Sequence, residues 1–297
     1  MMRKSWLPAY LALGTVWGCS FIFIELGLEF LTPFGVAFIR CALGAITLLI
    51  FTKIRKVDLP ADRKIWQKLW VVAMLLNVIP GVLFAFAQQY VTSVLASIIN
   101  AGTPLMTLVF MLIVFREEKL KPEQIIGLII GALGVLTVVG VWKDLGDNQL
   151  VGVIALLIAI SCYGASYPYS TRNVIPLKLK PEALATGQLI MAAVTLLPFF
   201  IINGISNDFY RPQSVIAMLC LGIFGSGFAY IWNFAITAAA GSAIASTVTY
   251  LTPVVAVIVG FLYLGEVIVW HEIVGALIVI VGALLSQGRL NRLVMTK

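Results

Sequence analysis

Apolar residues fill ten stretches of this chain, and short polar segments separate them. Each stretch is close to the roughly 20 residues that an α-helix needs to cross the hydrocarbon core of a bilayer. The longest polar interruption, from Thr52 to Lys68, is too short to form a soluble domain. The pattern therefore predicts an all-α integral membrane protein with ten transmembrane helices in a single domain, residues 1–297. The expected helices are about 7–27, 33–52, 69–89, 93–115, 124–142, 150–170, 183–203, 214–236, 241–264 and 271–288.

Two stretches of the chain share one residue pattern. The stretch "SVLASIINAGTP", which begins at Ser93, is matched 149 positions later by "SAIASTVTYLTP". Further matches follow in the same order, including "WGCSF" from Trp17 with "YGASY" from Tyr163. Because unrelated apolar helices would not match collinearly, we predict two homologous five-helix repeats, residues 1–142 and 147–297. An odd number of helices in each repeat places the second repeat upside down in the membrane.

Composition and charge agree with a membrane protein. Hydrophobic residues make up 61% of the chain and charged residues 11%, against roughly 45–50% and about 25% in soluble domains. Of the 20 lysines and arginines, 17 fall in segments that are cytoplasmic if both termini lie inside; Lys143 and Arg211 fall outside, and Arg40 lies within a helix. Since cytoplasmic loops carry the excess of basic residues, we predict a multi-pass protein of the cell membrane with both termini cytoplasmic.

The sequence lacks the motifs of an enzyme or a metal site. It has one histidine and four cysteines, with neither H-E-x-x-H, nor G-x-S-x-G, nor a cysteine pair at zinc-like spacing. A P-loop is also missing, so ATP would not drive transport directly. We predict no catalytic residues, no metal, no cofactor, no nucleic-acid partner and no obligate protein partner. The expected partners are a small-molecule substrate and the lipid bilayer.

Inverted repeats are typical of secondary transporters, whose substrate site lies at the interface of the two halves. Several motifs also point to a family: "WGCSF" in the first expected helix, "PFGVAFIR" at the start of the second, and Thr-Pro in the fourth and ninth. With these motifs the chain resembles the EamA-type ten-helix exporters of the drug/metabolite transporter superfamily. The resemblance implies a metabolite or amino-acid exporter with a central cavity between helices 1, 3, 4, 6, 8 and 9. Some of these relatives export aromatic amino acids.

Polar residues in the fourth and ninth expected helices keep to one helical face. Ser97 and Asn100 lie three residues apart, and Pro104 follows four residues later. Ser246 and Thr249 repeat this spacing in the ninth helix. Lipid disfavours such a stripe, so it faces either a cavity or neighbouring helices, where small and hydroxyl-bearing residues allow close packing.

Other helices offer aromatic and amide side chains. Trp17 and Phe21 lie one turn apart, and Tyr163 and Tyr167 repeat this spacing in the sixth expected helix. Aromatic walls would suit an amphipathic or aromatic substrate, with amides and hydroxyls fixing its polar end; the alternative is packing or anchoring at the membrane interface. The expected cavity residues are Trp17, Phe21, Asn77, Phe84, Gln88, Ser97, Asn100, Tyr163, Tyr167, Tyr230, Asn233, Ser246, Thr249 and Tyr250.

Glycine and proline predict where helices are irregular or closely packed. The dipeptide PG in the third expected helix and the run GSG in the eighth should loosen both helices near their middles. Gly127 and Gly134, and likewise Gly275 and Gly282, lie seven residues apart, which leaves a smooth seam for close packing. We therefore expect the fifth and tenth helices to be scaffold.

Two ionisable residues lie inside the first two expected helices. Arg40 is seven residues into its helix, where an arginine costs at least about 2.5–3.5 kcal/mol. Glu25 lies near the same end of the preceding helix, so the two side chains could form a structural ion pair. Alternatively, Arg40 binds a substrate carboxylate or Glu25 carries protons.

We predict a secondary transporter that exports a small metabolite, an amino acid or a related amphipathic solute, by alternating access at the repeat interface. The middles of the first and sixth helices contain no carboxylate, which favours transport driven by the solute's own gradient. A proton-coupled antiporter that uses Glu25 is the alternative, and a channel or a lipid-handling scaffold is the alternative of another class. A sugar-phosphate carrier would need more than the single buried cation available here.

Overall fold

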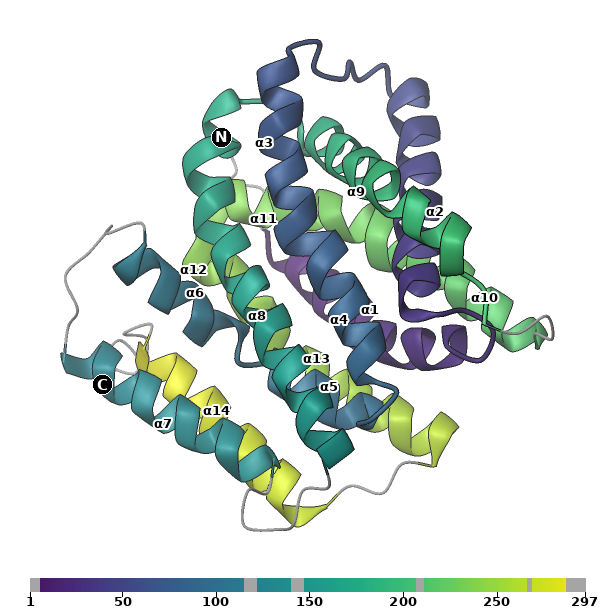
Figure 1. Ribbon diagram of the computed structural model, residues 1–297. Coiled ribbons are helices and arrows are strands. Elements are labelled where there is room, and N and C mark those ends of the chain that lie inside the picture. Colours follow the sequence, from purple (N-terminus) through teal and green to yellow (C-terminus); the bar gives the residue numbers. More distant parts are fainter. Residues whose placement is uncertain (1–5, 115–121, 140–146, 207–210, 266–268, 287–297) are drawn as a thin grey trace.

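The computed structural model is a bundle of long helices (Figure 1). Within the described residues every regular element is helical, and extended backbone is paired in a single bridge between Leu31 and Ile205. Two helices, α7 (Pro122–Val139) and α14 (Trp270–Ser286), lie side by side at one edge of the bundle. The structure describes residues 6–114, 122–139, 147–206, 211–265 and 269–286.

Eight helical segments are long and apolar enough to cross a membrane, while α7 and α14 contain shorter apolar stretches. These findings agree with the predicted all-α membrane protein, whereas the number of ten helices and the inverted repeat stay predictions. The eight candidate spans are Leu7–Gly27 (α1), Pro33–Ile54 (α2), Arg63–Ala87, Ser93–Ile113, Gln149–Leu177, Pro181–Asn203 (α9), Pro212–Ala240 and Ser242–Tyr263.

Five of these spans are composite, because the helical hydrogen bonding changes along them. They comprise α3 (Arg63–Ala73), η1 (Met74–Val78) and α4 (Ile79–Ala87); α5 (Ser93–Asn100) and α6 (Thr103–Ile113); α8 (Asp147–Asn173) and η2 (Ile175–Leu177); α10 (Pro212–Cys220), η3 (Leu221–Phe228) and α11 (Ala229–Ala240); and α12 (Ser242–Ser246), η4 (Thr247–Tyr250), α13 (Thr252–Val259) and η5 (Gly260–Leu264).

Local sequence explains where helices begin. Thr32 and Thr92 each accept a hydrogen bond from the backbone N–H three residues later, at 3.2 and 3.1 Å, which caps α2 and α5. Asp62 caps α3 in the same way through the Lys64 N–H at 2.8 Å. Gly241 separates α11 from α12 at φ 83°, a left-handed conformation that side chains disfavour.

The two loosened regions are π-helices. In η1 and η3 the α-helical ladder gives way to i→i+5 hydrogen bonding, and these elements lie before Pro80 and around the GSG run. Proline lacks the N–H that would continue the ladder, and glycine lowers helix stability. π-Helical turns are frequent at functional sites, and both of these lie in the middle of candidate spans.

The glycine seam brings α7 and α14 together. A Cβ atom on Gly134 would lie 2.6 Å from the backbone N of Val279, and one on Gly282 would lie 2.8 Å from the carbonyl oxygen of Gly127. Such approaches are possible only without a side chain, so glycine sets the spacing of this pair. The seam agrees with the scaffold role expected for these helices.

The remaining helices of the bundle pack against one another in several pairs. Helix α2 packs along α9, α1 contacts α10, α11 and α13, and α8 contacts α4 and α6. Large apolar side chains, including Ile50 on α2 and Ile201 on α9, stay exposed on the outside. Soluble proteins rarely expose apolar surface on this scale, so the outside of the bundle is suited to lipid.

Candidate functional site

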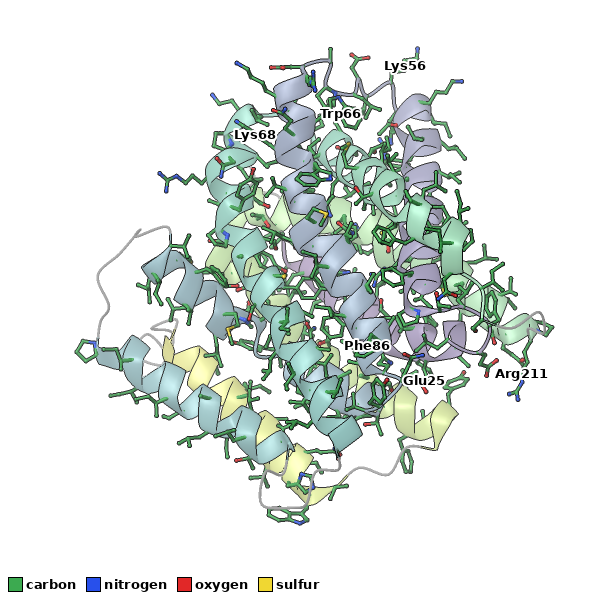
Figure 2. The ribbon with its side chains drawn as sticks, in the orientation of Figure 1. Glu25, Lys56, Trp66, Lys68, Phe86 and Arg211 are labelled. Atoms are coloured by element: carbon green, nitrogen blue, oxygen red, sulfur yellow. The ribbon has the colours of Figure 1, made fainter. Side chains whose placement is uncertain are left out.

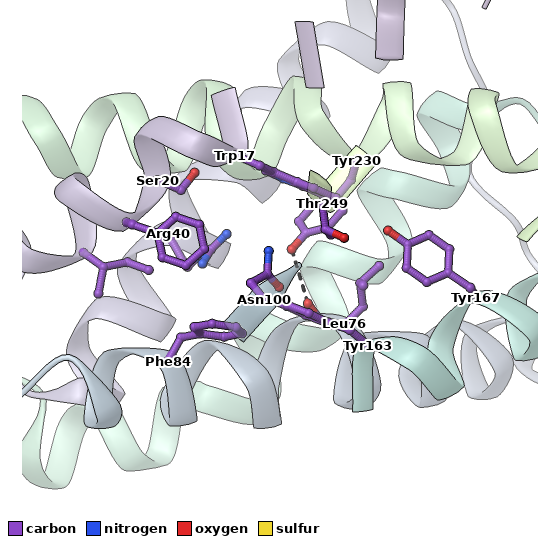
Figure 3. A pocket seen from close by; sticks show the side chains of 12 residues that line it. Trp17, Ser20, Arg40, Leu76, Phe84, Asn100, Tyr163, Tyr167, Tyr230 and Thr249 are labelled. Carbon is purple, nitrogen blue, oxygen red and sulfur yellow. Dashed lines mark hydrogen bonds between the residues drawn. The ribbon is translucent and has the colours of Figure 1, made fainter. Parts of the chain in front are cut away.

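A pocket lies inside the bundle, near the middles of the surrounding spans. Its cavity volume is about 40 Å³, below the roughly 300–1,000 Å³ of typical small-molecule sites, so its walls must move apart to admit a metabolite. Its walls come from α1, α2, η1, α4, α5, α8, α11 and η4 (Figure 3). The twelve lining residues are Trp17, Ser20, Phe21, Ile24, Arg40, Leu76, Phe84, Asn100, Tyr163, Tyr167, Tyr230 and Thr249.

Aromatic rings form much of the pocket wall. The rings of Phe84 and Tyr163 are stacked with centroids 5.5 Å apart, and Phe21 meets Phe84 edge-on at 5.8 Å. Trp17 meets Tyr230 edge-on at 6.0 Å. Such pairs contribute about 0.5–1.5 kcal/mol beyond the burial of their area, so the wall is rigid and suited to an apolar or aromatic group.

Two of the π-helices, η1 and η3, each supply an acceptor for a pocket aromatic. The indole Nε1 of Trp17 donates to the carbonyl oxygen of Gly225 in η3 at 3.2 Å. The hydroxyl of Tyr230 donates to the carbonyl oxygen of Leu76 in η1 at 3.3 Å (Figure 3). The orientation of these rings therefore depends on the irregular backbone of the third and eighth candidate spans.

Arg40 is the cation of the pocket. Its side chain is only 6% exposed, and its Nε donates to the hydroxyl oxygen of Ser226 in η3 at 3.0 Å. Figure 3 shows Arg40 and Asn100 directed at the same space. The lining contains no carboxylate, so the groups that line the pocket do not neutralise this charge.

The polar residues of the wall are fixed by local hydrogen bonds. The amide nitrogen of Asn100 donates to the Thr252 hydroxyl at 3.3 Å, and its amide oxygen accepts from the Thr103 hydroxyl at 3.3 Å. The Thr249 hydroxyl donates to the carbonyl oxygen of Ser246 at 2.9 Å. Asn100 thus ties α5 to α13 at the point where both spans are broken by a Thr-Pro sequence.

Glu25 is not among the lining residues. Its carboxylate accepts a hydrogen bond from the amide nitrogen of Gln88 at 3.5 Å, and the same amide donates to the carbonyl oxygen of Phe21 at 2.9 Å. Gln88 therefore links α4 to α1 beside the pocket. The direct ion pair between Glu25 and Arg40 stays a prediction.

The structure brings together many of the side chains that the sequence proposed for the cavity and separates others. The expected residues that line the pocket are Trp17, Phe21, Arg40, Phe84, Asn100, Tyr163, Tyr167, Tyr230 and Thr249. The expected residues outside its lining are Glu25, Asn77, Gln88, Ser97, Asn233, Ser246 and Tyr250.

Several polar residues outside the pocket lining form hydrogen bonds elsewhere in the bundle. Asn77 accepts a hydrogen bond from Gln188, which joins η1 to α9. The hydroxyls of Ser97 and Ser246 donate to carbonyl oxygens three residues earlier in their own helices, at 2.7 and 3.1 Å. Both hydroxyls are thus hydrogen-bonded within their own helix, outside the pocket lining.

Sequence reasoning did not select Ser20, Ile24 or Leu76, which also line the pocket. Ser20 and Ile24 are three and seven residues after Trp17, so helical spacing could have found them. Leu76 gives no such signal, because it is an apolar residue in an apolar span whose orientation depends on the π-helix.

The comparison with known proteins identifies the family. A sequence model described as the EamA-like transporter family matches residues 4–140 and, a second time, residues 150–287. The chain belongs to the EamA-like transporter family. This EamA-like protein is accordingly a multi-pass membrane transporter of the drug/metabolite transporter superfamily.

Relatives of this EamA-like transporter match along most of its length. An "uncharacterized transporter" of Archaeoglobus fulgidus is 30% identical, covering 92% of this chain and 94% of the relative. The "uncharacterized inner membrane transporter YedA" of Escherichia coli is 28% identical, covering 85% and 80%. A solved crystal structure superposes with a TM-score of 0.70 at 16% identity, covering 98% and 99% of the chains. This last match supports the fold alone.

Proposed function

We propose that this protein is a secondary transporter that exports a small amphipathic metabolite, such as an amino acid, by alternating access to the central pocket. The observation that carries the proposal is that both halves of the chain build the pocket. Trp17, Arg40 and Phe84 come from the first half, and Tyr163 and Tyr230 come from the second. A site shared in this way opens to one side or the other when the halves rock against each other.

Three findings support two inverted repeats, residues 1–142 and 147–297. The family's sequence model matches the chain twice. The π-helices η1 and η3 begin 147 positions apart, within the range of the sequence offsets. Helix α8 packs against α4 and α6 in the way that α1 packs against η3 and α13. With α7 and α14 as the fifth and tenth spans, the proposed arrangement has ten transmembrane helices.

The charges of the pocket favour a carrier that uses the solute's own gradient. Proton exchange at the binding site needs a group that gains and loses a proton near neutral pH. The lining offers Arg40, which stays protonated, and no carboxylate. Glu25 lies outside the lining and is the candidate for the alternative, a proton-coupled antiporter.

Counterflow in proteoliposomes tests this function. Purified protein is reconstituted into liposomes that are preloaded with a high concentration of an exported solute, with phenylalanine as the first choice. These liposomes should accumulate labelled solute transiently and saturably. A channel or a lipid-handling scaffold would not show this exchange. An imposed pH gradient should leave the exchange unchanged. Uphill accumulation driven by the gradient and lost in Glu25→Gln would establish the antiporter instead.

The proposed membrane orientation has both termini in the cytoplasm. Figure 2 shows Lys56 and Lys68 at one end of the bundle and Arg211 toward the other. Because the basic end should be cytoplasmic, Ser206→Cys should react with a membrane-impermeant maleimide in intact cells. Lys180→Cys should react only after permeabilisation. Both positions are exposed, and the wild type with its own four cysteines provides the background. Labelling of Lys180→Cys in intact cells would contradict the orientation.

A further inference from the structure

The pocket contains a buried charge, the guanidinium of Arg40, and burying this charge is energetically unfavourable. Arg40 lies seven residues after Pro33, the first residue of α2. At a rise of 1.5 Å per residue, this position is about 10 Å along the helix. An arginine well inside a bilayer costs at least about 2.5–3.5 kcal/mol. Such a residue is retained where it pairs with a group of opposite charge or binds a ligand.

The hydrogen-bond partner of Arg40 is neutral. Among the described residues, the guanidinium donates through Nε to the Ser226 hydroxyl, which uses one of its five N–H groups. Ser226 is fully buried in η3, so it fixes the direction of the guanidinium without cancelling its charge. The pocket that Arg40 lines contains aromatic, aliphatic, hydroxyl and amide groups, and no carboxylate.

We propose that the pocket binds the carboxylate of an amphipathic monoanion through Arg40, and that the aromatic wall receives its apolar body. This inference rests on the proposed transport function and specifies the substrate class of the same pocket. The planar guanidinium matches a carboxylate through two parallel hydrogen bonds. Phe84, Tyr163 and Trp17 surround the same space with rings that suit an aromatic or long aliphatic group.

Charge complementarity distinguishes carboxylate monoanions from phosphate monoesters and from solutes that carry an ammonium group. A phosphate monoester carries about −1.5 to −2 charges, which one arginine does not balance. A substrate ammonium group would meet no carboxylate in the lining and would lie in the field of Arg40. A carboxylic acid without an amino group should therefore bind more tightly than the amino acid of the same skeleton.

Three probes with one skeleton test this ranking: 3-phenylpropanoate, phenylalanine and 2-phenylethylamine. They carry a carboxylate, both charges, and an ammonium group. With detergent-purified protein at neutral pH, isothermal titration should give 3-phenylpropanoate a Kd at least tenfold lower than phenylalanine. No binding of 2-phenylethylamine should be measurable. Since this ranking is measured on the wild type, it does not depend on whether any variant folds.

Variants then assign the anion site. Arg40→Gln should weaken 3-phenylpropanoate binding at least a hundredfold, while Arg40→Lys, which keeps the charge and loses the forked geometry, should weaken it about tenfold. Arg211→Gln is the matched control, because that side chain is 67% exposed and pairs with Glu29 at 3.6 Å. This control should leave the Kd within twofold of the wild type.

Several results would overturn the anion site. These are binding of 2-phenylethylamine as tight as that of 3-phenylpropanoate, an unchanged Kd in Arg40→Gln, or no binding of any of the three probes. Counterflow separates this failure from that of the proposed function. Saturable exchange of another solute with the ranking reversed would leave the transporter intact and remove the anion site. Arg40-dependent anion binding without any exchange would keep the site and refute transport.

Discussion

Trp17→Ala should lower the rate of counterflow at least tenfold without a matching loss of protein. The substitution removes the ring that packs on Tyr230 at 6.0 Å and the hydrogen bond to the carbonyl oxygen of Gly225. An aromatic side chain that anchors a ligand contributes about 2 kcal/mol or more, and about 1.4 kcal/mol changes an equilibrium constant tenfold. The measurement is initial exchange rate per mole of reconstituted protein.

Trp70→Ala is the matched control for this prediction. Trp70 lies on α3, is 42% exposed, and donates its Nε1–H to the Thr195 hydroxyl away from the pocket. The same change of residue there should leave exchange within about twofold of the wild type, because Trp70 does not line the pocket. Equal losses in Trp17→Ala and Trp70→Ala would show that the pocket is not the transport site.

Gly282→Ala should destabilise the protein while sparing the binding pocket. The added Cβ would overlap the backbone N of Gly131 and lie 2.8 Å from the carbonyl oxygen of Gly127. Because these are backbone atoms of α7, the two helices must move apart. Overpacking of this kind typically costs about 1–3 kcal/mol, so the Tm of the purified protein should fall by several degrees.

Gly81→Ala makes the same chemical change in open surroundings. A Cβ at Gly81 would contact the Ala37 Cβ at 3.5 Å, an ordinary van der Waals distance. There alanine should leave the Tm unchanged or raise it. Alanine lowers the conformational entropy of the unfolded chain, which stabilises the folded protein by about 0.4–1 kcal/mol. A Gly282→Ala protein as stable as Gly81→Ala would contradict the close seam between α7 and α14.

Much of the fold follows from patterns that the sequence carries locally. Ten apolar stretches predicted the positions of the helices, and the eight longer candidate spans lie close to the expected ranges. The PG and GSG sequences predicted the loosened regions, which are π-helices in the structure. These predictions succeeded for one reason. Length, apolar content and the missing N–H of proline are local properties, and they determine the structure of a single helix without reference to its neighbours.

The composition of the pocket was harder to predict because it depends on contacts between helices. The sequence suggested Asn77 for the cavity, but it could not show that Gln188, 111 positions later, donates a hydrogen bond to it. The partner of Arg40, Ser226, is 186 positions away and lies in a π-helix. Periodicity selects a face of one helix, whereas the partner of that face is decided by tertiary packing.

The central claim is that one pocket, built by both halves, is reached in turn from each side of the membrane. Ser20→Cys in a protein whose four native cysteines are replaced by alanine tests it, because Ser20 lines the pocket and the substitution is nearly isosteric. In oriented vesicles, a membrane-impermeant thiol reagent should modify this cysteine from either side, and excess transported solute should slow both reactions. Modification from one side only, or no protection by a solute that the protein exchanges, would contradict the account.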